Sequence, residues 1–270
     1  MKKIKFFQEY LDIISEAQEK RLKNLNCYLM PQDIQFLIQK ERLFYLKNEN
    51  TIEIIEKNDN YYKVCFYSNE NLKFLSFVSE KPILTDLPYS GEKNQRFYDL
   101  ENMLLREGFV LNAESSRMIK RDFSHKEIDD KIFQDYSIAH MKETDIEKVM
   151  KIWKDNFDDI QNLLYSKEEL KEHIDDIYVC KDKLGNIVGV MEIVISGKNG
   201  WIQKIAIDKS FQGKGLGTIM EIFYINICKT LGIKNLLLYT IDDNLQAQAF
   251  HKKFGFVPDG KHNCQYIYRR

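Results

Sequence analysis

The feature that most constrains this chain lies at residues 212–217, where Gln-Gly-Lys-Gly-Leu-Gly places a glycine at every second position. An apolar segment at residues 201–207 precedes it and predicts a strand, while residues 218–231 predict a helix. Glycine has no Cβ, so such a loop can turn tightly and let a ligand approach its backbone. The first N–H groups of a helix have no partner inside the helix, and the helix dipole favours negative charge there. The sequence therefore predicts a phosphate-binding loop between a strand and a helix.

Two common phosphate-binding patterns do not fit this stretch. A P-loop requires Ser or Thr after its lysine, and Lys214 is followed by Gly215. A dinucleotide fingerprint requires a third glycine where Thr218 stands. The pattern that fits is Gln/Arg-x-x-Gly-x-Gly, carried by Gln212, Gly215 and Gly217. It resembles the acyl-coenzyme A loop of the GNAT superfamily of N-acetyltransferases. For the glycines alone, the alternative is an ordinary strand-to-helix turn.

The predicted elements around the loop follow one another in the order of a GNAT domain. Capping boxes at Thr144 with Glu147 and at Ser166 with Glu169 mark the starts of two helices. Strands are predicted at residues 136–141, 177–181, 187–195, 201–208, 235–241, 257 and 265–268, and helices at 144–157, 166–175, 218–231 and 244–254. This succession falls within residues 135–270, which we interpret as an acetyltransferase domain.

A second pattern supports the resemblance. The GNAT pattern Asn-x-x-Ala-x-x-Phe-Tyr-x-Lys-x-Gly-Phe is matched here by Asn244, Ala247, Phe250, His251, Lys253, Gly255 and Phe256. The chain departs from it at His251, where the family often has tyrosine. The resemblance implies an α/β (α+β) fold, in which helices flank a mixed, mostly antiparallel sheet.

The first half of the chain, residues 1–134, predicts a separate α+β domain. Helices are expected at residues 5–24, 31–46 and 92–107, and strands at 51–57, 61–68, 72–80 and 116–122. Residues 104–109 followed by 117–120 resemble the close of a GNAT domain, so we interpret this half as a degenerate GNAT-like repeat without a glycine loop. It is either a wall of the substrate site or a stabilising or dimerising appendage. Residues 123–134 predict a connecting helix or linker.

The charge balance and the cysteines limit which partners and which location are expected for this protein. Lys and Arg total 40 against 41 Asp and Glu, a net charge of −1, which argues against nucleic acid and against an anionic membrane. The five cysteines show no Cys-x-x-Cys spacing and indicate reduced packing residues of a cytoplasmic protein. No apolar run is long enough to span a membrane. Neither a metal nor a nucleic acid is expected, and a homodimer remains open.

The resemblance also implies how the coenzyme binds. Acetyl-CoA would be the donor in a ternary complex with an acceptor amine, and backbone N–H groups of residues 212–217 would hold its pyrophosphate. The preceding strand would present its backbone to the pantetheine and the thioester, and an N–H near Ile205 would stabilise the oxyanion. Lys214 either adds a charge or is a solvated loop lysine. The residues expected at the coenzyme are Ile205, Ala206, Ile207, Gln212, Gly213, Lys214, Gly215, Leu216, Gly217, Thr218 and Asn244.

Two residues are candidates for proton transfer. Glu192 interrupts an apolar strand, so it either faces solvent or serves as a base or substrate contact. His251 could give a proton to the departing thiolate, or it is a helix-surface histidine. Tyr178, Tyr224 and Tyr239 are alternative donors. The predicted function is acetyl transfer from acetyl-CoA to a primary amine of a small molecule or peptide. The alternative is a non-catalytic acyl-CoA-binding or sensing module.

Overall fold

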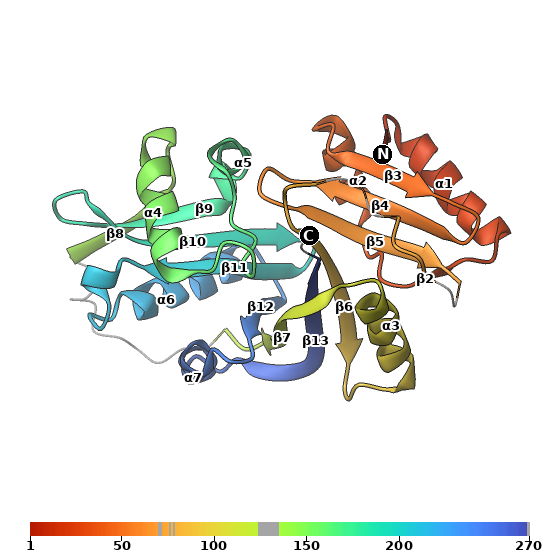
Figure 1. Ribbon diagram of the computed structural model, residues 1–270. Coiled ribbons are helices and arrows are strands. Elements are labelled where there is room, and N and C mark those ends of the chain that lie inside the picture. The colour runs from red at the N-terminus through yellow and green to blue at the C-terminus, as the bar shows by residue number, and fades with distance from the viewer. Residues whose placement is uncertain (70–71, 76, 78, 124–134, 269–270) are drawn as a thin grey trace. The chain divides into compact units, whose positions relative to one another are not determined.

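The computed structural model describes residues 1–69, 72–75, 77, 79–123 and 135–268 (Figure 1). The chain divides into two compact units, the first comprising Met1–Glu114 with His262–Arg270 and the second Ser115–Lys261. Both division points fall inside strands, in β7 (Val110–Lys120) and β13 (Val257–Tyr268). The domain boundary expected after residue 134 stays a prediction. It adjoins residues 124–134, which make up most of the expected linker and lie outside the described residues.

The second unit is built on a sheet with the strand order β7-β12-β11-β10-β9-β8. Its other strands are β8 (Tyr136–His140), β9 (Ile177–Asp182), β10 (Ile187–Ser196), β11 (Asn199–Ile207) and β12 (Asn235–Ile241). Neighbouring strands are antiparallel except β11 and β12, which run parallel. The parallel register ends at Ile202 opposite Leu238, although β11 continues to Ile207. The two strands therefore part, and this opening positions the candidate site.

Helices cover both faces of this sheet. They are α4 (Ile146–Asn156), α5 (Lys167–Glu172), α6 (Leu216–Thr230) and α7 (Leu245–Lys253), with 3₁₀ turns at Glu143–Asp145, Ile174–Asp176 and Lys209–Phe211. One core lies between the sheet and helices α4 and α5 and includes Trp153 and Val190. The other lies against α6 and includes Met191 and Ile193. Side chains of β10 thus alternate between two buried faces, which explains its nearly continuous apolar sequence.

The first unit repeats this arrangement. Its sheet runs β1-β3-β4-β5-β6 and continues to β13, and β2 pairs with β5. The bounds are β1 (Lys2–Lys3), α1 (Phe7–Glu19), β2 (Lys23–Asn24), α2 (Pro31–Gln39), β3 (Leu43–Lys47), β4 (Thr51–Lys57), β5 (Tyr62–Ser68), β6 (Ile83–Ser90) and α3 (Gln95–Arg106). As in the second unit, two helices precede three antiparallel strands, and the next pair, β5 and β6, is parallel. The described residues between β5 and β6 form no helix, so nothing there corresponds to α6.

The fold class predicted from the sequence is confirmed, as are most elements of the second unit, whereas five local predictions are wrong. The helix expected over residues 5–24 ends at Glu19, and residues 23–24 form β2. The helix expected over residues 31–46 ends at Gln39, because Glu41 turns left-handed with φ of 54° and the β-prone residues that follow form β3. The described part of segment 72–80 is not a strand, and the next strand is β6. The expected closing strand pair is one strand, β13. The first capping box fails, because Thr144 lies inside a 3₁₀ turn, where the Asp145 carboxylate accepts from Lys142 N–H.

Candidate functional site

The three glycines of the loop meet three different steric demands. Gly213 and Gly215 adopt left-handed conformations, with φ of 75° and 82°, and a Cβ on either would meet nothing within 4 Å. Lys214 between them has no positive φ, so the handedness of the backbone alternates. Such alternation turns successive N–H groups toward one concavity and creates an anion-binding nest. Gly217 lies in the first turn of α6, where a Cβ would approach Phe250 Cζ of α7 to 3.3 Å. The positive φ values favour glycine at 213 and 215, the close approach of Phe250 favours it at 217, and the outer side of the loop is open.

The start of α6 offers unpaired backbone donors. The helix begins at Leu216, and its first internal bond runs from Ile219 N–H to Gly215 O, 3.2 Å. Gly215 has no side chain that could cap the helix. The N–H groups of Leu216, Gly217 and Thr218 precede that first bond, so they have no acceptor within the helix. Together with the helix dipole they form a binding site for phosphate oxygens.

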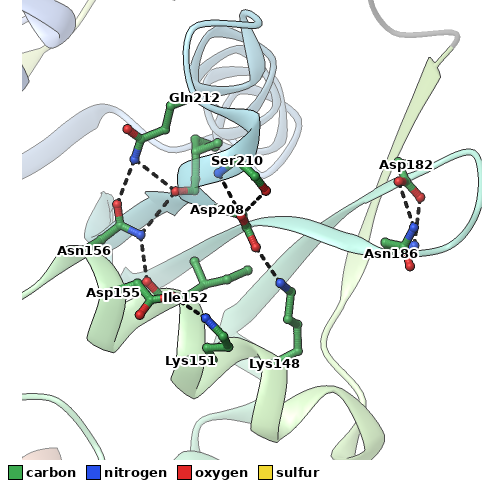
Figure 2. A network of polar contacts seen from close by, with 11 residues as sticks. Lys148, Lys151, Ile152, Asp155, Asn156, Asp182, Asn186, Asp208, Ser210 and Gln212 are labelled. Atoms are coloured by element: carbon green, nitrogen blue, oxygen red, sulfur yellow. Dashed lines mark hydrogen bonds and ion pairs between the residues drawn. The ribbon is translucent and has the colours of Figure 1, made fainter.

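Helix α4 anchors the stretch before the glycines through a salt bridge (Figure 2). Lys148 Nζ lies 2.5 Å from Asp208 Oδ2, and Ser210 donates to Asp208 Oδ1 through both its N–H and its hydroxyl. The hydrogen bonds from Lys148 and Ser210 lower the pKa of Asp208 to about 2. Asp208 therefore stays ionised near neutral pH and holds the 3₁₀ turn at the end of β11.

The Gln212 side chain shapes the loop instead of pointing outward. Its amide nitrogen donates to Asn156 Oδ1, 3.0 Å, and to the Ile207 carbonyl, 3.2 Å. Asn156, the last residue of α4, donates to the same carbonyl and to Ile152 O, as Figure 2 shows. Sequence reasoning missed Asn156, because nothing in its local pattern relates it to a loop 56 residues away. Gln212 and Asn156 together fix where β11 ends and the loop begins.

The end of β11 presents an open strand edge beside the loop. Ile205, Ala206 and Ile207 pair with β10 on one side, and on the other side their register with β12 has already ended. Successive residues of a strand direct their N–H and C=O groups to opposite sides. Because Asp208 N–H donates to Val188 O, the groups of Ala206 point toward β10, and those of Ile205 and Ile207 face the opening. The Ile207 carbonyl is already taken by Asn156 and Gln212. An extended ligand with amide groups could bind this edge as an added strand does.

The equivalent opening in the first unit is closed by the chain itself. Asn26 is buried, and its Oδ1 accepts from Phe66 N–H of β5, 2.8 Å. Its amide nitrogen donates across the gap to Thr85 Oγ1, 2.6 Å, and to Asp86 O, 2.9 Å, both in β6. One side-chain amide thus bridges the two strands where they part, so this unit offers no free strand edge there.

Glu192 does not face solvent, which excludes the solvated alternative. It is fully buried, and its carboxylate accepts from Lys204 Nζ, 2.8 Å, and from Tyr165 OH, 2.7 Å. Lys204 is also buried and lies over the rings of Tyr165 and Trp153, at 4.3 and 5.4 Å from their centroids. The β10–β11 register skips Gln203, and this bulge places Lys204 opposite Glu192. No sequence pattern points to Tyr165 as a partner of this carboxylate.

His251 is not a helix-surface histidine either, since only 4% of it is exposed. Its Nδ1 lies 3.4 Å from Oε2 of Glu221, a fully buried residue of α6. Of the alternative proton donors, Tyr224 is committed to structure, because its buried hydroxyl donates to Gly200 O and accepts from Leu237 N–H. Burial raises the pKa of Tyr224.

The other tyrosines differ in exposure. Tyr178 is buried against Phe223, while Tyr239 is 43% exposed and stacks on Trp201 with ring centroids 6.1 Å apart. Asn244 caps α7, accepting from Ala247 N–H at 3.0 Å, and its contact with a coenzyme stays a prediction.

Further observations bear on the chemistry of the site. Lys214 Nζ lies 4.5 Å above the Phe211 ring, which keeps its charge beside the loop. All five cysteines are free thiols. Among the described residues, no group of three or more His, Cys, Asp or Glu side chains is placed to hold a metal ion. The helices in that part of the chain are too short or too polar to cross a membrane.

Residues 140–256 match the model of the acetyltransferase (GNAT) family. A glucosamine 6-phosphate N-acetyltransferase of Arabidopsis thaliana is 28% identical over 98 residues, which are 33% of this chain and 64% of that protein. The chain thus spans less than two thirds of the length of this relative.

Solved structures share the fold over nearly the whole chain. A tandem GNAT protein from the clavulanic acid biosynthesis pathway superposes with a TM-score of 0.61 at 9% identity, covering 96% of this chain and 93% of that one. A GNAT-family acetyltransferase from Colwellia psychrerythraea gives 0.54 at 12% identity, with 99% of both chains covered. A tandem arrangement agrees with the repeated element order of the two units.

Proposed function

We propose that the GNAT-family domain formed by residues 140–256 is an N-acetyltransferase. It transfers the acetyl group of acetyl-CoA to a primary amine of a small molecule or peptide, by direct attack in a ternary complex. The observation that carries this proposal is the junction of β11 and α6, where unpaired helix N–H groups adjoin an open strand edge. In coenzyme A a pyrophosphate is joined directly to an arm that contains amides, and the junction suits both parts.

Each part of the coenzyme then has a defined place. The nest and the N–H groups of residues 213–218 hold the pyrophosphate, with Lys214 and the cap residue Asn244 beside it. Ile205, Ala206 and the stretch to Ile207 line the pantetheine, and an N–H of this edge stabilises the oxyanion, an effect worth roughly 3–4 kcal/mol. The amine nitrogen forms the new C–N bond, the C–S bond breaks, and the amine proton ends on the departing thiolate.

Proton transfer requires a base and an acid near the thioester. We place His251 in this role, because its imidazole is buried behind the loop beside a carboxylate of α6. Glu192 is a weaker candidate, since Lys204 and Tyr165 already occupy its carboxylate. The alternative function, a non-catalytic acyl-CoA-binding or sensing module, follows from histidine standing where the family often has tyrosine. Binding occurs in both cases, and only turnover separates them.

The name of the Arabidopsis relative suggests which acceptor amine to test first. Because the Arabidopsis protein is named as a glucosamine 6-phosphate N-acetyltransferase, that amino sugar phosphate is the first amine to test. Glucosamine, polyamines, amino acids and short peptides follow. The five free cysteines support a reducing location, and we propose the cytoplasm.

The decisive experiment is calorimetric titration of acetyl-CoA into the full chain and two glycine variants. Gly215→Glu introduces a carboxylate into the phosphate nest, and we expect an affinity loss of at least about 100-fold, or about 2.7 kcal/mol. Gly197→Glu is the matched control, because Gly197 also has a positive φ and open surroundings but lies in the turn at the other end of β11. Unchanged affinity in a folded Gly215→Glu protein would remove the loop from the site. Release of coenzyme A thiol with an amine then distinguishes an enzyme from a sensor.

A further inference from the structure

Helices α6 and α7 bury a carboxylate against an imidazole. Glu221 is fully buried in α6, and His251 of α7 is nearly so. Their closest approach is 3.4 Å, between Glu221 Oε2 and His251 Nδ1. Three buried atoms, Glu221 Oε1, Glu221 Oε2 and His251 Nδ1, form no hydrogen bond with any described residue.

Such a pair is unfavourable for folding alone. Burying a carboxylate without hydrogen bonds is strongly destabilising unless a cation or a donated proton compensates it. Within the described residues, the imidazole is the group placed to compensate Glu221, as the rings of Phe250 and Phe256 flank it edge-on. Buried polar groups without satisfied hydrogen bonds call for a specific explanation, and a catalytic role is one such explanation.

The pair lies directly behind the candidate coenzyme loop. Glu221 follows Gly217 by about one turn of α6. Phe250, the neighbour of His251, packs against Gly217, 3.3 Å from a Cβ placed there. The helix that binds phosphate at its start therefore carries the carboxylate, and the helix that packs on it carries the imidazole. Movement of a few tenths of an ångström would bring Nδ1 and Oε2 into ordinary hydrogen-bond distance.

We infer that Glu221 is a positioning residue that keeps the His251 proton on Nδ1, so that Nε2 is the nitrogen that exchanges a proton during acetyl transfer. This inference rests on the proposed function. Nε2 accepts the proton that the amine loses as the C–N bond forms, and Glu221 stabilises the resulting imidazolium. The same proton then passes from Nε2 to the sulfur as the C–S bond breaks. An orienting carboxylate on the remote nitrogen of a catalytic imidazole is the arrangement of the Ser-His-Asp triad, reached here without a serine.

The test is the tautomer of His251, read from ¹⁵N chemical shifts of histidine-labelled full-length protein without any ligand. The chain has five histidines, so the spectrum is sparse, and His251→Gln assigns the signal. We expect the Nδ1–H tautomer in the wild type and a shift of the proton to Nε2 in Glu221→Leu, where leucine preserves the packing. Asp176→Asn is the matched control, because the pair of His173 and Asp176 is partly exposed and 3.9 Å apart. An Nε2–H tautomer in the wild type, or no change in Glu221→Leu, would overturn the inference.

Turnover supplies an independent readout. With acetyl-CoA and the best amine from the screen, Glu221→Leu should lower kcat about 10- to 100-fold while the acetyl-CoA affinity changes less than about 3-fold, as expected for lost proton transfer. His251→Gln should produce a similar loss, and the double variant should lose little more, because the two residues act as one unit. Independent, multiplicative losses would contradict the pairing. If acetyl-CoA does not bind the wild type, the proposed function fails, whereas the tautomer experiment still decides the pairing.

Discussion

The buried pair of Glu192 and Lys204 allows a double-substitution cycle with a defined outcome. The variants are Glu192→Gln, Lys204→Met and the two combined, each of nearly unchanged side-chain volume. Lys204→Met leaves a fully buried carboxylate whose remaining donor, among the described residues, is the Tyr165 hydroxyl. Glu192→Gln leaves a buried ammonium between two aromatic rings with a neutral acceptor. Each single substitution therefore leaves one buried charge without its opposite charge, whereas the double substitution removes both charges.

The geometry sets the expected size of these effects. At the 2.8 Å separation of Lys204 Nζ and Glu192 Oε2, an effective dielectric constant of 20 gives an attraction of about 6 kcal/mol, most of which offsets desolvation. Removing one partner of a buried pair typically destabilises by about 3–5 kcal/mol. The Tyr165 hydrogen bond recovers part of that loss for Lys204→Met, so we expect about 3 kcal/mol for each single variant. The double variant should lose about 1–2 kcal/mol, which makes the coupling about 4–5 kcal/mol.

Urea unfolding followed by tryptophan fluorescence measures this coupling. Both tryptophans of the chain, Trp153 and Trp201, lie in the second unit, so the signal reports the unit that contains the pair. Single losses below about 1 kcal/mol that add within about 0.5 kcal/mol would show that water reaches the pair and would refute the reasoning. Turnover of the folded Glu192→Gln protein separates structure from catalysis, because loss of a general base lowers kcat at least about 100-fold.

Three further predictions concern other buried or strained positions. Burial raises the pKa of Glu53 to about 8, so its folding contribution is full below about pH 4.5 and is lost as pH rises through 8. Between about pH 6 and 8 the wild type should lose about 2–3 kcal/mol more unfolding free energy than Glu53→Gln, measured by circular dichroism in urea, and equal slopes would contradict this. Gly217→Ala places a methyl group close to Phe250 and should weaken acetyl-CoA binding, measured by calorimetry, about 10-fold. Adding Phe250→Leu to this variant should restore the binding, and no recovery would contradict the steric cause. Lys148→Met should reduce acetyl-CoA affinity a few-fold and stability by under about 1 kcal/mol, while Lys151→Met, an exposed control on α4, should change neither.

Much of the second unit was predictable because its signals are local. Gly215 has a left-handed backbone conformation at the start of α6, and glycine is the residue that such a turn favours, so the local sequence indicates it. Ser166 and Glu169 cap α5 reciprocally, as their spacing indicates. Strand β12 has the predicted bounds, since a run of apolar residues between turns fits a strand buried on both faces. In these cases the residues that make the structure are neighbours in sequence.

The features that escaped prediction depend on contacts between distant segments. The surroundings of Glu192 are set by a bulge that reorients Lys204 and by Tyr165 from the α4–α5 connection. The helix expected over residues 31–46 included β3, because the left-handed turn at Glu41 that ends the helix is not a glycine and gives no local signal. The partner of His251 lies on another helix, 30 residues earlier in the chain, and no periodicity links the two.

The two units share a parallel strand pair that parts at one end, and what fills the opening distinguishes them. In the second unit the edge of β11 stays open and leads into the glycine loop. In the first, the Asn26 amide donates to one strand and accepts from the other, which are the hydrogen bonds that an amide of a bound coenzyme would make. The Asn26 side chain occupies the opening, and the described residues between β5 and β6 form no helix to bind phosphate. Both features oppose coenzyme binding by this unit. We therefore expect calorimetry to find one acetyl-CoA per chain and none in Gly215→Glu. Two sites per chain, or one surviving in that variant, would show that the first unit also binds coenzyme.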